Sequence, residues 1–216
     1  PSIKKEKRKK LEELAEFWKT ANTVSKTKMA YSEEMKVILP SDNYIGESGI
    51  AFTLWRMSGI QLNYRKLVEK GIPGMREEIM EFLSHAVPGT KQHKLYTSMI
   101  DAIDIFCDVC RYYSGMTKEM ARNEPNTSYR KDLNEMSVIL EKITETKPES
   151  FREGLHLMFL YNAIDGTRNY GRMDDALGDL YSSDLNAGRI TEDEAIRLLT
   201  SIWKLMADRN YRYDTR

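Results

Sequence analysis

The sequence predicts a mainly α-helical fold with few or no strands. Apolar residues recur at spacings of three and four through most of the chain, as they do on one face of an amphipathic helix. Glycines and prolines separate these stretches where helices would end, and no convincing alternation with a period of two occurs. We therefore expect about seven or eight helices and an irregular portion over residues 23–61.

The composition indicates a globular protein without net charge. The 33 basic and 33 acidic residues cancel, which argues against a dedicated nucleic-acid binder. No run approaches the roughly 20 apolar residues needed to cross a membrane. The basic run Lys4–Lys10 leads into an amphipathic helix instead of the apolar core of a signal peptide, and we interpret it as a solvated first turn. We expect a cytoplasmic protein that binds neither nucleic acid nor membrane.

The first predicted helix covers residues 4–22, and the portion after it is the least regular of the chain. Its apolar stripe is Leu11, Leu14, Ala15, Trp18 and Ala21. Over residues 23–61, glycines interrupt an aromatic-rich stretch. Such a stretch suits either the lining of a pocket or an ordinary packed loop.

Three helices are predicted next. One starts at Tyr64 and ends at Gly71, and Pro73 suits the first turn of another that stops at Pro88-Gly89. A long helix then covers residues 91–122, with a stripe that we expect to be buried: Tyr96, Met99, Ile100, Ile103, Phe106, Cys107, Cys110 and Tyr113.

A further helix is expected over residues 128–143, and the helix after it is the most apolar of the chain. Ser150 and Glu153 have the spacing of a capping box at its start. From Phe151 to Ile164 this helix is apolar nearly all round, which predicts a central element buried on every side.

Residues 170–206 predict a helical hairpin. Gly188 suits the left-handed residue after a helix, and Thr191 with Glu194 has the spacing of a second capping box. The last helix carries one apolar face made of Ala195, Leu199, Ile202, Trp203 and Met206.

The residue types that often carry chemistry form no complete active site. Cys107 and Cys110 lie one helical turn apart on the apolar stripe, and no second pair completes a zinc site, so we interpret them as core residues. His156 suits a core position in the apolar helix. Asp174 and Asp175 are adjacent on a helix and point in different directions, with Asp174 suited to pair with Arg172.

Several motifs resemble those of one enzyme family. Gly171-Arg172-Met173-Asp174 and the stretch Asp184-Leu185-Asn186-Ala187-Gly188-Arg189-Ile190-Thr191 resemble the signature Gly-Arg…Asp-Leu-x-x-Gly-x-Ile-Thr of the glycyl radical enzymes, which include pyruvate formate-lyase and radical dehydratases. The stretches from Pro148 to His156, from Asn63 to Ile72 and from Leu11 to Lys19 resemble further motifs of that family in the same order.

The resemblance implies that the chain is one helical part of a larger enzyme. Family members are several times longer and fold as an α/β barrel wrapped in helices. They store a radical on a C-terminal glycine and pass it to a barrel cysteine, and neither motif is matched in this chain. We therefore expect residues 1–216 to be a single helical segment, an N-terminal third of a lyase, dehydratase or formate acetyltransferase-like transferase, without catalytic residues and inactive alone.

The resemblance also implies site residues, a cofactor and partners. In the family, residues just before the Gly-Arg motif contribute to the substrate pocket, which implies Thr167, Arg168 and Asn169 as substrate-binding residues here. The family's polar substrate contact shortly before the motif at Asn63 is missing from this chain, and Arg56 is the residue that we expect to replace it. No metal is expected in this chain. The parent would need a glycyl radical installed by an S-adenosylmethionine iron–sulfur activase, as in anaerobic metabolism. Its partners would be that activase, the rest of its barrel, a small-molecule substrate and a second copy in a homodimer.

An alternative of another class stays open at this point. The chain would then be a free-standing helical interaction domain that has lost the radical machinery.

Overall fold

The computed structural model describes residues 5–21, 26, 29–38, 62–165 and 170–214. Contacts divide the chain into two compact units, residues 1–58 and residues 59–216. The sequence-based expectation of a single segment over residues 1–216 stays a prediction.

The first unit contains two described helices, α1 (Lys5–Ala21) and α3 (Glu33–Ile38). Helix α1 matches the predicted range 4–22, and its residues from Lys7 to Lys10 are exposed as expected. Helix α3 lies inside the portion 23–61 that was predicted to be irregular, so the prediction was wrong for the residues of this helix. Its aromatic and glycine-rich part, residues 39–61, lies outside the described residues.

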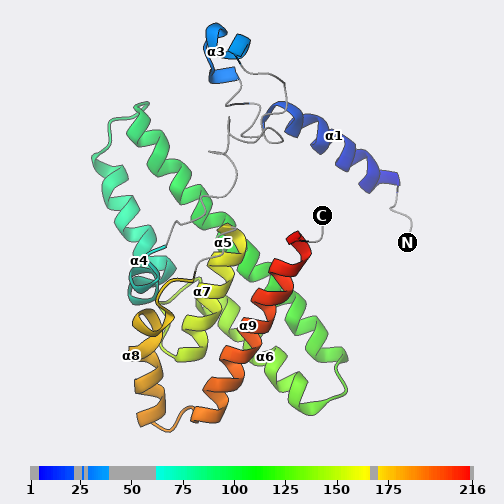
Figure 1. The fold of residues 1–216 in the computed structure, drawn as a ribbon, viewed down its shortest axis with the longest axis vertical. Helices are drawn as coiled ribbons and strands as arrows, with labels where there is room; N and C mark the ends of the chain where they lie inside the picture. Colours follow the sequence, from blue (N-terminus) through cyan, green and yellow to red (C-terminus); the bar gives the residue numbers. More distant parts are fainter. Residues whose placement is uncertain (1–4, 22–25, 27–28, 39–61, 166–169, 215–216) are drawn as a thin grey trace. The chain divides into compact units, whose positions relative to one another are not determined.

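The second unit is made of six described helices, and its described residues contain no strand. Figure 1 shows the long helix α5 running beside α4 and α6, with α7 between α8 and α9. No helix in the described part of the chain has an apolar stretch long enough to span a bilayer. The helices are α4 (Tyr64–His85), α5 (Lys91–Asn123), α6 (Thr127–Lys142), α7 (Phe151–Asp165), α8 (Met173–Asn186) and α9 (Glu192–Asp214).

Helix α4 joins two predicted helices across a sharp kink at Gly71. The backbone there has φ 65° and ψ 178°, outside the helical region. A Cβ atom at this position would lie 2.5 Å from the Cα of Lys147, in the connection before α7. Glycine is therefore required both by the dihedral angle and by the close approach of another segment.

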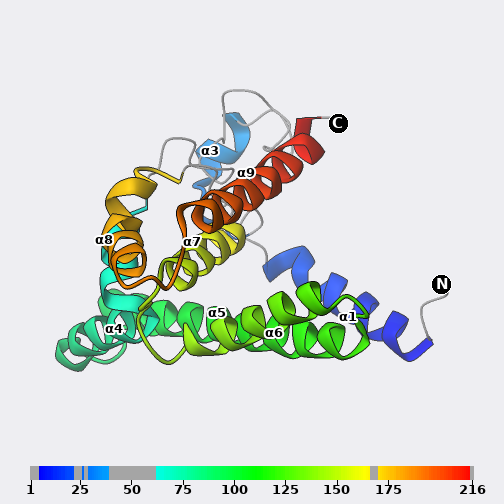
Figure 2. The ribbon, with the colours of Figure 1, turned by 90° about the horizontal axis from the view of Figure 1, so that it is seen from below.

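Helices α5 and α6 form a hairpin, and Figure 2 shows them running side by side. Small polar residues meet inside it, where Ser114 Oγ donates to the backbone carbonyl of Ser137 over 2.9 Å. The predicted stripe of α5 is buried only in its middle, at Phe106, Cys107 and Cys110. The prediction was wrong for Met99 and Tyr113, which are exposed, because periodicity shows which face of a helix is apolar but not how far neighbouring helices cover it.

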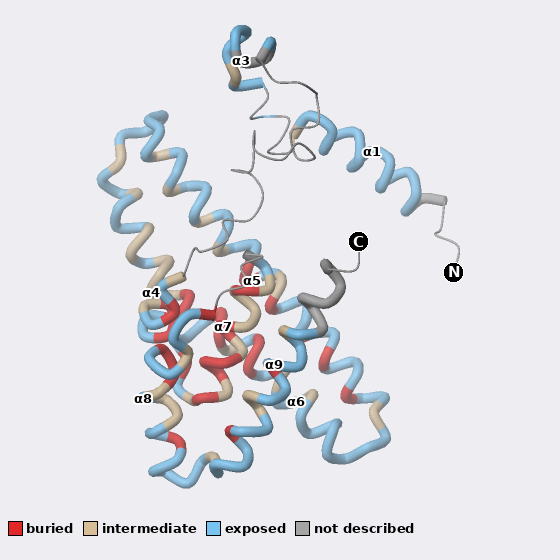
Figure 3. Tube along the Cα trace, in the orientation of Figure 1, coloured by how far each residue is buried: buried red, intermediate tan, exposed pale blue. Residues whose placement is uncertain are grey.

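Helix α7 is central, as predicted, and contacts α4, α6 and α8. Figure 3 shows the buried residues gathered where these helices meet. Gly154 permits the close packing of α7 on α8, because a Cβ there would lie 2.7 Å from Leu177 Cδ2 and 2.9 Å from Leu180 Cδ1. The prediction that this helix is buried on every side was wrong at its C-terminal end, where Ile164 is 43% exposed.

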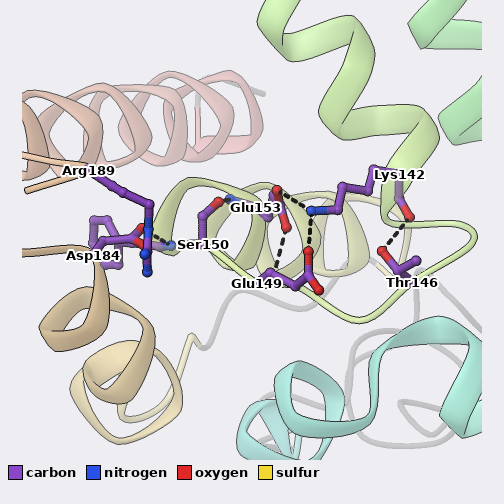
Figure 4. Close-up of polar contacts among 8 residues, drawn as sticks. Lys142, Thr146, Glu149, Ser150, Glu153, Asp184 and Arg189 are labelled. Atoms are coloured by element: carbon purple, nitrogen blue, oxygen red, sulfur yellow. Dashed lines mark hydrogen bonds and ion pairs between the residues drawn. The ribbon is translucent and has the colours of Figure 1, made fainter. Parts of the chain in front are cut away.

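Asp184, near the end of α8, forms a hydrogen bond with the start of α7. Its Oδ2 accepts a hydrogen bond from the backbone N–H of Phe151 over 2.7 Å, and its Oδ1 accepts one from Arg189 Nε over 2.7 Å (Figure 4). The same end of α7 carries the predicted capping contact from Glu153 N–H to Ser150 Oγ. The carboxylate of Glu153 accepts from the N–H of Glu149 and not from that of Ser150.

The hairpin between α8 and α9 has the predicted caps. Gly188 has φ 65°, and its N–H donates to Leu185 while the N–H of Arg189 donates to the carbonyl of Asp184, which is the Schellman pattern. Thr191 and Glu194 donate and accept reciprocally, forming the capping box. In α9, Ala195 and Ile202 are buried, whereas Trp203 is 63% exposed, so the predicted apolar face was wrong at that residue.

Candidate functional site

The predicted substrate contacts fall outside the described residues. Thr167, Arg168 and Asn169 lie between Asp165, the last residue of α7, and Tyr170, and Arg56 lies in the first unit. The structure therefore does not test these positions. It does describe the residues on either side of the segment 166–169, and these contact one side chain in common.

That side chain is Tyr64, the first residue of α4. Asn162 Nδ2, in the last turn of α7, donates a hydrogen bond to Tyr64 Oη over 2.6 Å. Tyr64 is 3% exposed and Asn162 is fully buried. Buried polar groups of this kind require a partner, because leaving one without a hydrogen bond costs about 1–3 kcal/mol. The bond therefore holds the end of α7 against the start of α4.

Tyr64 also contacts the residue that follows the segment. The rings of Tyr64 and Tyr170 are stacked, with centroids 6.4 Å apart and an angle of 11° between their planes. Tyr170 is buried. Gly171, with φ 55°, then turns the chain into α8. One tyrosine thus contacts residues on both sides of residues 166–169.

The backbone of Tyr64 is itself held by local contacts. Asn63 caps α4, because its Oδ1 accepts from the N–H of Lys66 over 3.0 Å. Such a cap supplies a partner for one of the N–H groups that a helix start leaves unpaired. The tyrosine therefore projects from a stable helix start.

Charged side chains lie beside this cluster. Arg65 donates from Nη1 to Asp175 Oδ1 and from Nε to Glu69 Oε1, each over 2.9 Å. The hydrogen bond to Glu69 and the negative charge of Asp175 raise the pKa of Arg65. This contact between two exposed side chains joins α4 to α8 at their N-terminal turns.

Arg172 and Asp174 form a separate pair at the start of α8. Arg172 donates from Nε to Asp174 Oδ1 over 2.8 Å and from Nη2 to Oδ2 over 2.5 Å. This two-point contact lowers the pKa of Asp174 to about 2. Asp174 and Asp175 thus point to different partners, as predicted, and Asp174 stays ionised at neutral pH, which makes it a poor proton donor.

A cavity of about 340 Å³ lies at this place, lined by Leu62, Asn63, Tyr64, Arg65, Arg172 and Asp175. Its lining combines one buried aromatic ring with two guanidinium groups. Another cavity, of about 470 Å³, lies between α5 and α6 and is lined by two methionines, two glutamates, one asparagine and one leucine. We take the first as the candidate site because it adjoins the residues that flank the segment 166–169.

The cysteines and His156 lie elsewhere. Cys107 and Cys110 are buried in the hydrophobic core, as predicted. Burial, and to a smaller extent the charge of the neighbouring Cys107, raises the pKa of Cys110 to about 12. The Cys110 thiol therefore stays protonated at neutral pH and is a weak nucleophile. His156 donates from Nδ1 to the carbonyl of Arg152 over 2.8 Å, and burial lowers its pKa. In the described ranges, no group of three or more histidines, cysteines and carboxylates is placed to hold a metal.

Sequence reasoning missed Asn162. The available signal was a lone amide inside the most apolar helix of the chain, because such a group has to find a hydrogen-bond partner. The identity of that partner could not be read from the sequence, since Tyr64 lies 98 residues away.

Known proteins resemble the chain over nearly its whole length. Residues 2–214 match the family described as pyruvate formate lyase-like. The chain is 28% identical to the isethionate sulfite-lyase of Nitratidesulfovibrio vulgaris, over 91% of this chain and 26% of that protein. It is 25% identical to the (2S)-3-sulfopropanediol dehydratase of Klebsiella oxytoca, over 90% of this chain and 25% of that protein.

The fold has a counterpart among solved structures. The glycerol-bound form of the B12-independent glycerol dehydratase from Clostridium butyricum matches 94% of this chain and 26% of its own, with a TM-score of 0.68 and 23% identity. The chain thus spans about a quarter of the length of these relatives. The helical segment expected from the sequence is confirmed, and the match over residues 2–214 shows that the chain belongs to the pyruvate formate lyase-like family.

Proposed function

We propose that the chain builds one wall of the substrate pocket in a glycyl radical lyase or dehydratase. Its family membership and its relatives, a sulfite-lyase and a dehydratase, support this class of enzyme. The observation that carries the proposal is the position of Tyr64, which lines a cavity and contacts residues on both sides of the segment 166–169. In this proposal the chain acts as scaffold and pocket wall, and it supplies no catalytic residue.

The substrate class that we favour is a small hydroxylated molecule with an anionic group. The names of the two relatives, isethionate sulfite-lyase and (2S)-3-sulfopropanediol dehydratase, both refer to sulfonates. A guanidinium binds such an oxyanion through charge-assisted hydrogen bonds. We assign this contact to Arg168, with Thr167 and Asn169 beside it as hydrogen-bonding groups and Arg56 as a further polar contact.

The radical chemistry would belong to the whole enzyme. A glycyl radical, installed by an S-adenosylmethionine iron–sulfur activase, would supply the hydrogen abstraction. The activase, the rest of the barrel and a second copy in a homodimer are the partners that we propose, and anaerobic metabolism in the cytoplasm is the setting. The residues of this chain would bind and orient the substrate.

The test uses the full-length enzyme that contains this chain. After anaerobic treatment with the activase, electron paramagnetic resonance should detect a glycyl radical. Turnover is then measured with isethionate, (2S)-3-sulfopropanediol and uncharged glycerol. We expect Arg168→Ala to raise KM for a sulfonate substrate by about tenfold to a hundredfold, as loss of a charge-assisted contact would do. Arg168→Lys should recover part of the affinity, and Arg122→Ala, at an exposed position on α5, serves as the control.

Two results would contradict the proposal. Unchanged KM and kcat in Arg168→Ala would remove the assigned role of this residue. A full-length protein that never forms a radical under these conditions would favour the alternative of a helical interaction domain without radical machinery.

A further inference from the structure

We propose that the outer face of α5 is the surface on which a second copy of this chain docks, with the two α5 helices packed antiparallel. This face consists of six exposed apolar residues of the helix: Leu95, Met99, Ile105, Tyr112, Met116 and Met120. The proposal rests on the proposed function only in that a second copy is one of the partners named there. It requires neither the substrate contacts nor the radical chemistry.

The outer face is a second apolar face of a helix whose first apolar face is already covered. Phe106, Cys107 and Cys110 are buried on the covered face, and α5 packs against α4 and α6. Each of the six residues of the outer face is at least 40% exposed, and Figure 3 shows exposed stretches along α5. With Ala102 and Val109 between them, these residues recur at intervals of three and four, so they line one side of the helix. A contiguous exposed apolar surface of this kind marks an interaction site.

The two ends of the outer face match each other. In an antiparallel pair, Leu95 of one copy lies opposite Met120 of the other, and in the same register Met99 lies opposite Met116. Both pairs join flexible or branched apolar side chains, which adapt to one another when two helices pack. A twofold axis repeats each contact, because the same surface is used by both copies.

The middle of the outer face matches itself in the same register. Ala102 of one copy lies opposite Tyr112 of the other, so a small side chain meets a large one, and Ile105 lies opposite Val109. Alternation of small and large residues across facing positions lets two helices approach closely. Every apolar position of the face therefore meets an apolar position, which a surface shaped for an unrelated partner would not require.

The charges at the ends of α5 also favour an antiparallel copy. Lys91 and Lys94 lie near its start, where the first turn contains no acidic residue, and Glu119 and Glu124 lie near its end. Lysines at the start and glutamates at the end of a helix are both unfavourable for its own dipole. Within the described part of the chain, none of these four charges belongs to an ion pair. A second copy in the proposed register brings the lysines of each chain to the glutamates of the other.

A cavity lies where the second copy would insert its side chains. The cavity of about 470 Å³ between α5 and α6 is lined by Met116 and Met120, with Glu119 and Glu124 beside them. The proposed register places Leu95 of the second copy over the two methionines and its lysines next to the two glutamates. The apolar and the charged parts of this cavity thus each receive a complementary group.

The size of the outer face sets the strength that we expect. At a rise of 1.5 Å per residue, the stretch from Leu95 to Met120 is about 38 Å long, and a helix side about 10 Å wide gives roughly 400 Å² per copy. This is at the low end for specific interfaces, so the contact through α5 should form a weak dimer that dissociates on dilution in about the micromolar range. A weak equilibrium of this kind is well suited to measuring the effect of single substitutions.

The first experiment measures the dissociation constant of the dimer by sedimentation velocity over a concentration series, for residues 1–216 and for the full-length enzyme. Met116→Glu places a carboxylate opposite Met99 of the second copy and should raise the constant at least about a hundredfold. Because Met116 is exposed in the single chain, the helix content measured by circular dichroism should not change. Arg122→Glu, at an exposed position of α5 outside the outer face, is the control and should leave the constant unchanged.

The second experiment tests the antiparallel register by reversing charges. Lys94→Glu and Glu119→Lys should each raise the dissociation constant by about fivefold to twentyfold at low salt, because each creates two like-charge contacts in the dimer. An equal mixture of the two variants should restore the parent value, since both contacts of the mixed dimer join opposite charges. A parallel pair would place equal positions opposite each other, so a single reversal would exchange one repulsion for another and leave the constant unchanged.

The remaining outcomes overturn the proposal. A chain that stays monomeric at the highest concentration, a dimer that tolerates Met116→Glu, or charge reversals that are not rescued by mixing would each show that the outer face does not bind a second copy in this way. If the isolated chain responds but the full-length dimer does not, the rest of the polypeptide covers the face and the proposal is wrong for the enzyme.

The proposed function is decided by separate measurements. If Arg168→Ala raises KM while Met116→Glu leaves the dimer intact, the docking face is wrong and the substrate contact stands. If Met116→Glu separates the dimer while Arg168→Ala leaves KM unchanged, the substrate contact is wrong and the docking face stands.

Discussion

The carboxylate of Asp184 on α8 accepts the backbone N–H of Phe151, the first residue of α7, over 2.7 Å. The two residues lie 33 positions apart, and Asp184 is only 3% exposed. Its second oxygen accepts from Arg189, so the buried charge has an ionic partner as well. The aspartate of the family signature thus acts here as a cap for another helix, and it fixes the start of the element whose other end carries Asn162.

Asp184→Ala should lower the free energy of unfolding of this chain by about 2–4 kcal/mol. The substitution leaves the N–H of Phe151 and the guanidinium of Arg189 without their acceptor, and hydrogen bonds to charged groups are the costly ones to lose. Urea unfolding followed by circular dichroism would measure the change. Asp108→Asn, which alters an exposed carboxylate, should stay within about 0.5 kcal/mol of the parent. An equal response of the two variants would contradict the capping role.

Gly154→Ala should destabilise the chain by about 1–3 kcal/mol, although alanine is the better helix former. The added methyl would meet Leu177 and Leu180 of α8 at less than 3.0 Å, and overpacking of this kind forces side chains out of their preferred rotamers. Gly178→Ala is the matched control, because no atom lies within 4 Å of its added methyl. That variant should gain up to about 1 kcal/mol from helix propensity. Thermal unfolding of the two variants should therefore shift in opposite directions.

Gly71→Ala should cost more than Gly188→Ala, although both glycines have φ 65°. At Gly188 a left-handed backbone costs an alanine about 1–2 kcal/mol. At Gly71 the ψ of 178° combines with the positive φ in a region that is essentially confined to glycine, and an alanine there costs about 1–3 kcal/mol. At Gly71 the new Cβ would also lie 2.5 Å from the Cα of Lys147, whereas at Gly188 it would meet nothing within 4 Å. We expect Gly71→Ala to lose at least about 3 kcal/mol. Equal midpoints in urea would show that the connection before α7 can move away from α4.

The stability of the chain should fall with rising pH partly through Cys110. Burial raises the pKa of this thiol from 9.0 to about 12. Because the pKa is higher in the folded state, the contribution of this thiol is complete below pH 9.0 and is lost as the pH rises towards 12. Urea midpoints measured at several pH values from 8 upwards should therefore fall more steeply in the parent than in Cys110→Ala. Parallel curves would mean that the thiol ionises as easily in the folded chain as in the unfolded one.

Most of the helices could be predicted from the sequence, with the exceptions of α3, which lies in the portion predicted to be irregular, and of α4, which joins two predicted helices. Their ends depend on local signals, such as Gly188 after α8 and the pair Thr191 and Glu194 before α9, and the structure confirms these caps. Local signals suffice because a helix is made of hydrogen bonds between residues four positions apart, so capping residues and breakers mark its ends within a few positions.

The tertiary structure decided how far each apolar face is covered and which polar groups meet. Periodicity shows that Trp203 belongs to an apolar face, but it does not show that the packing of α9 leaves this side chain 63% exposed. It likewise marks Asn162 as a polar residue in an apolar helix, without indicating its partner Tyr64. Helix formation is local, whereas burial and the pairing of buried polar groups depend on which segments the fold brings together, and that information lies in the packing.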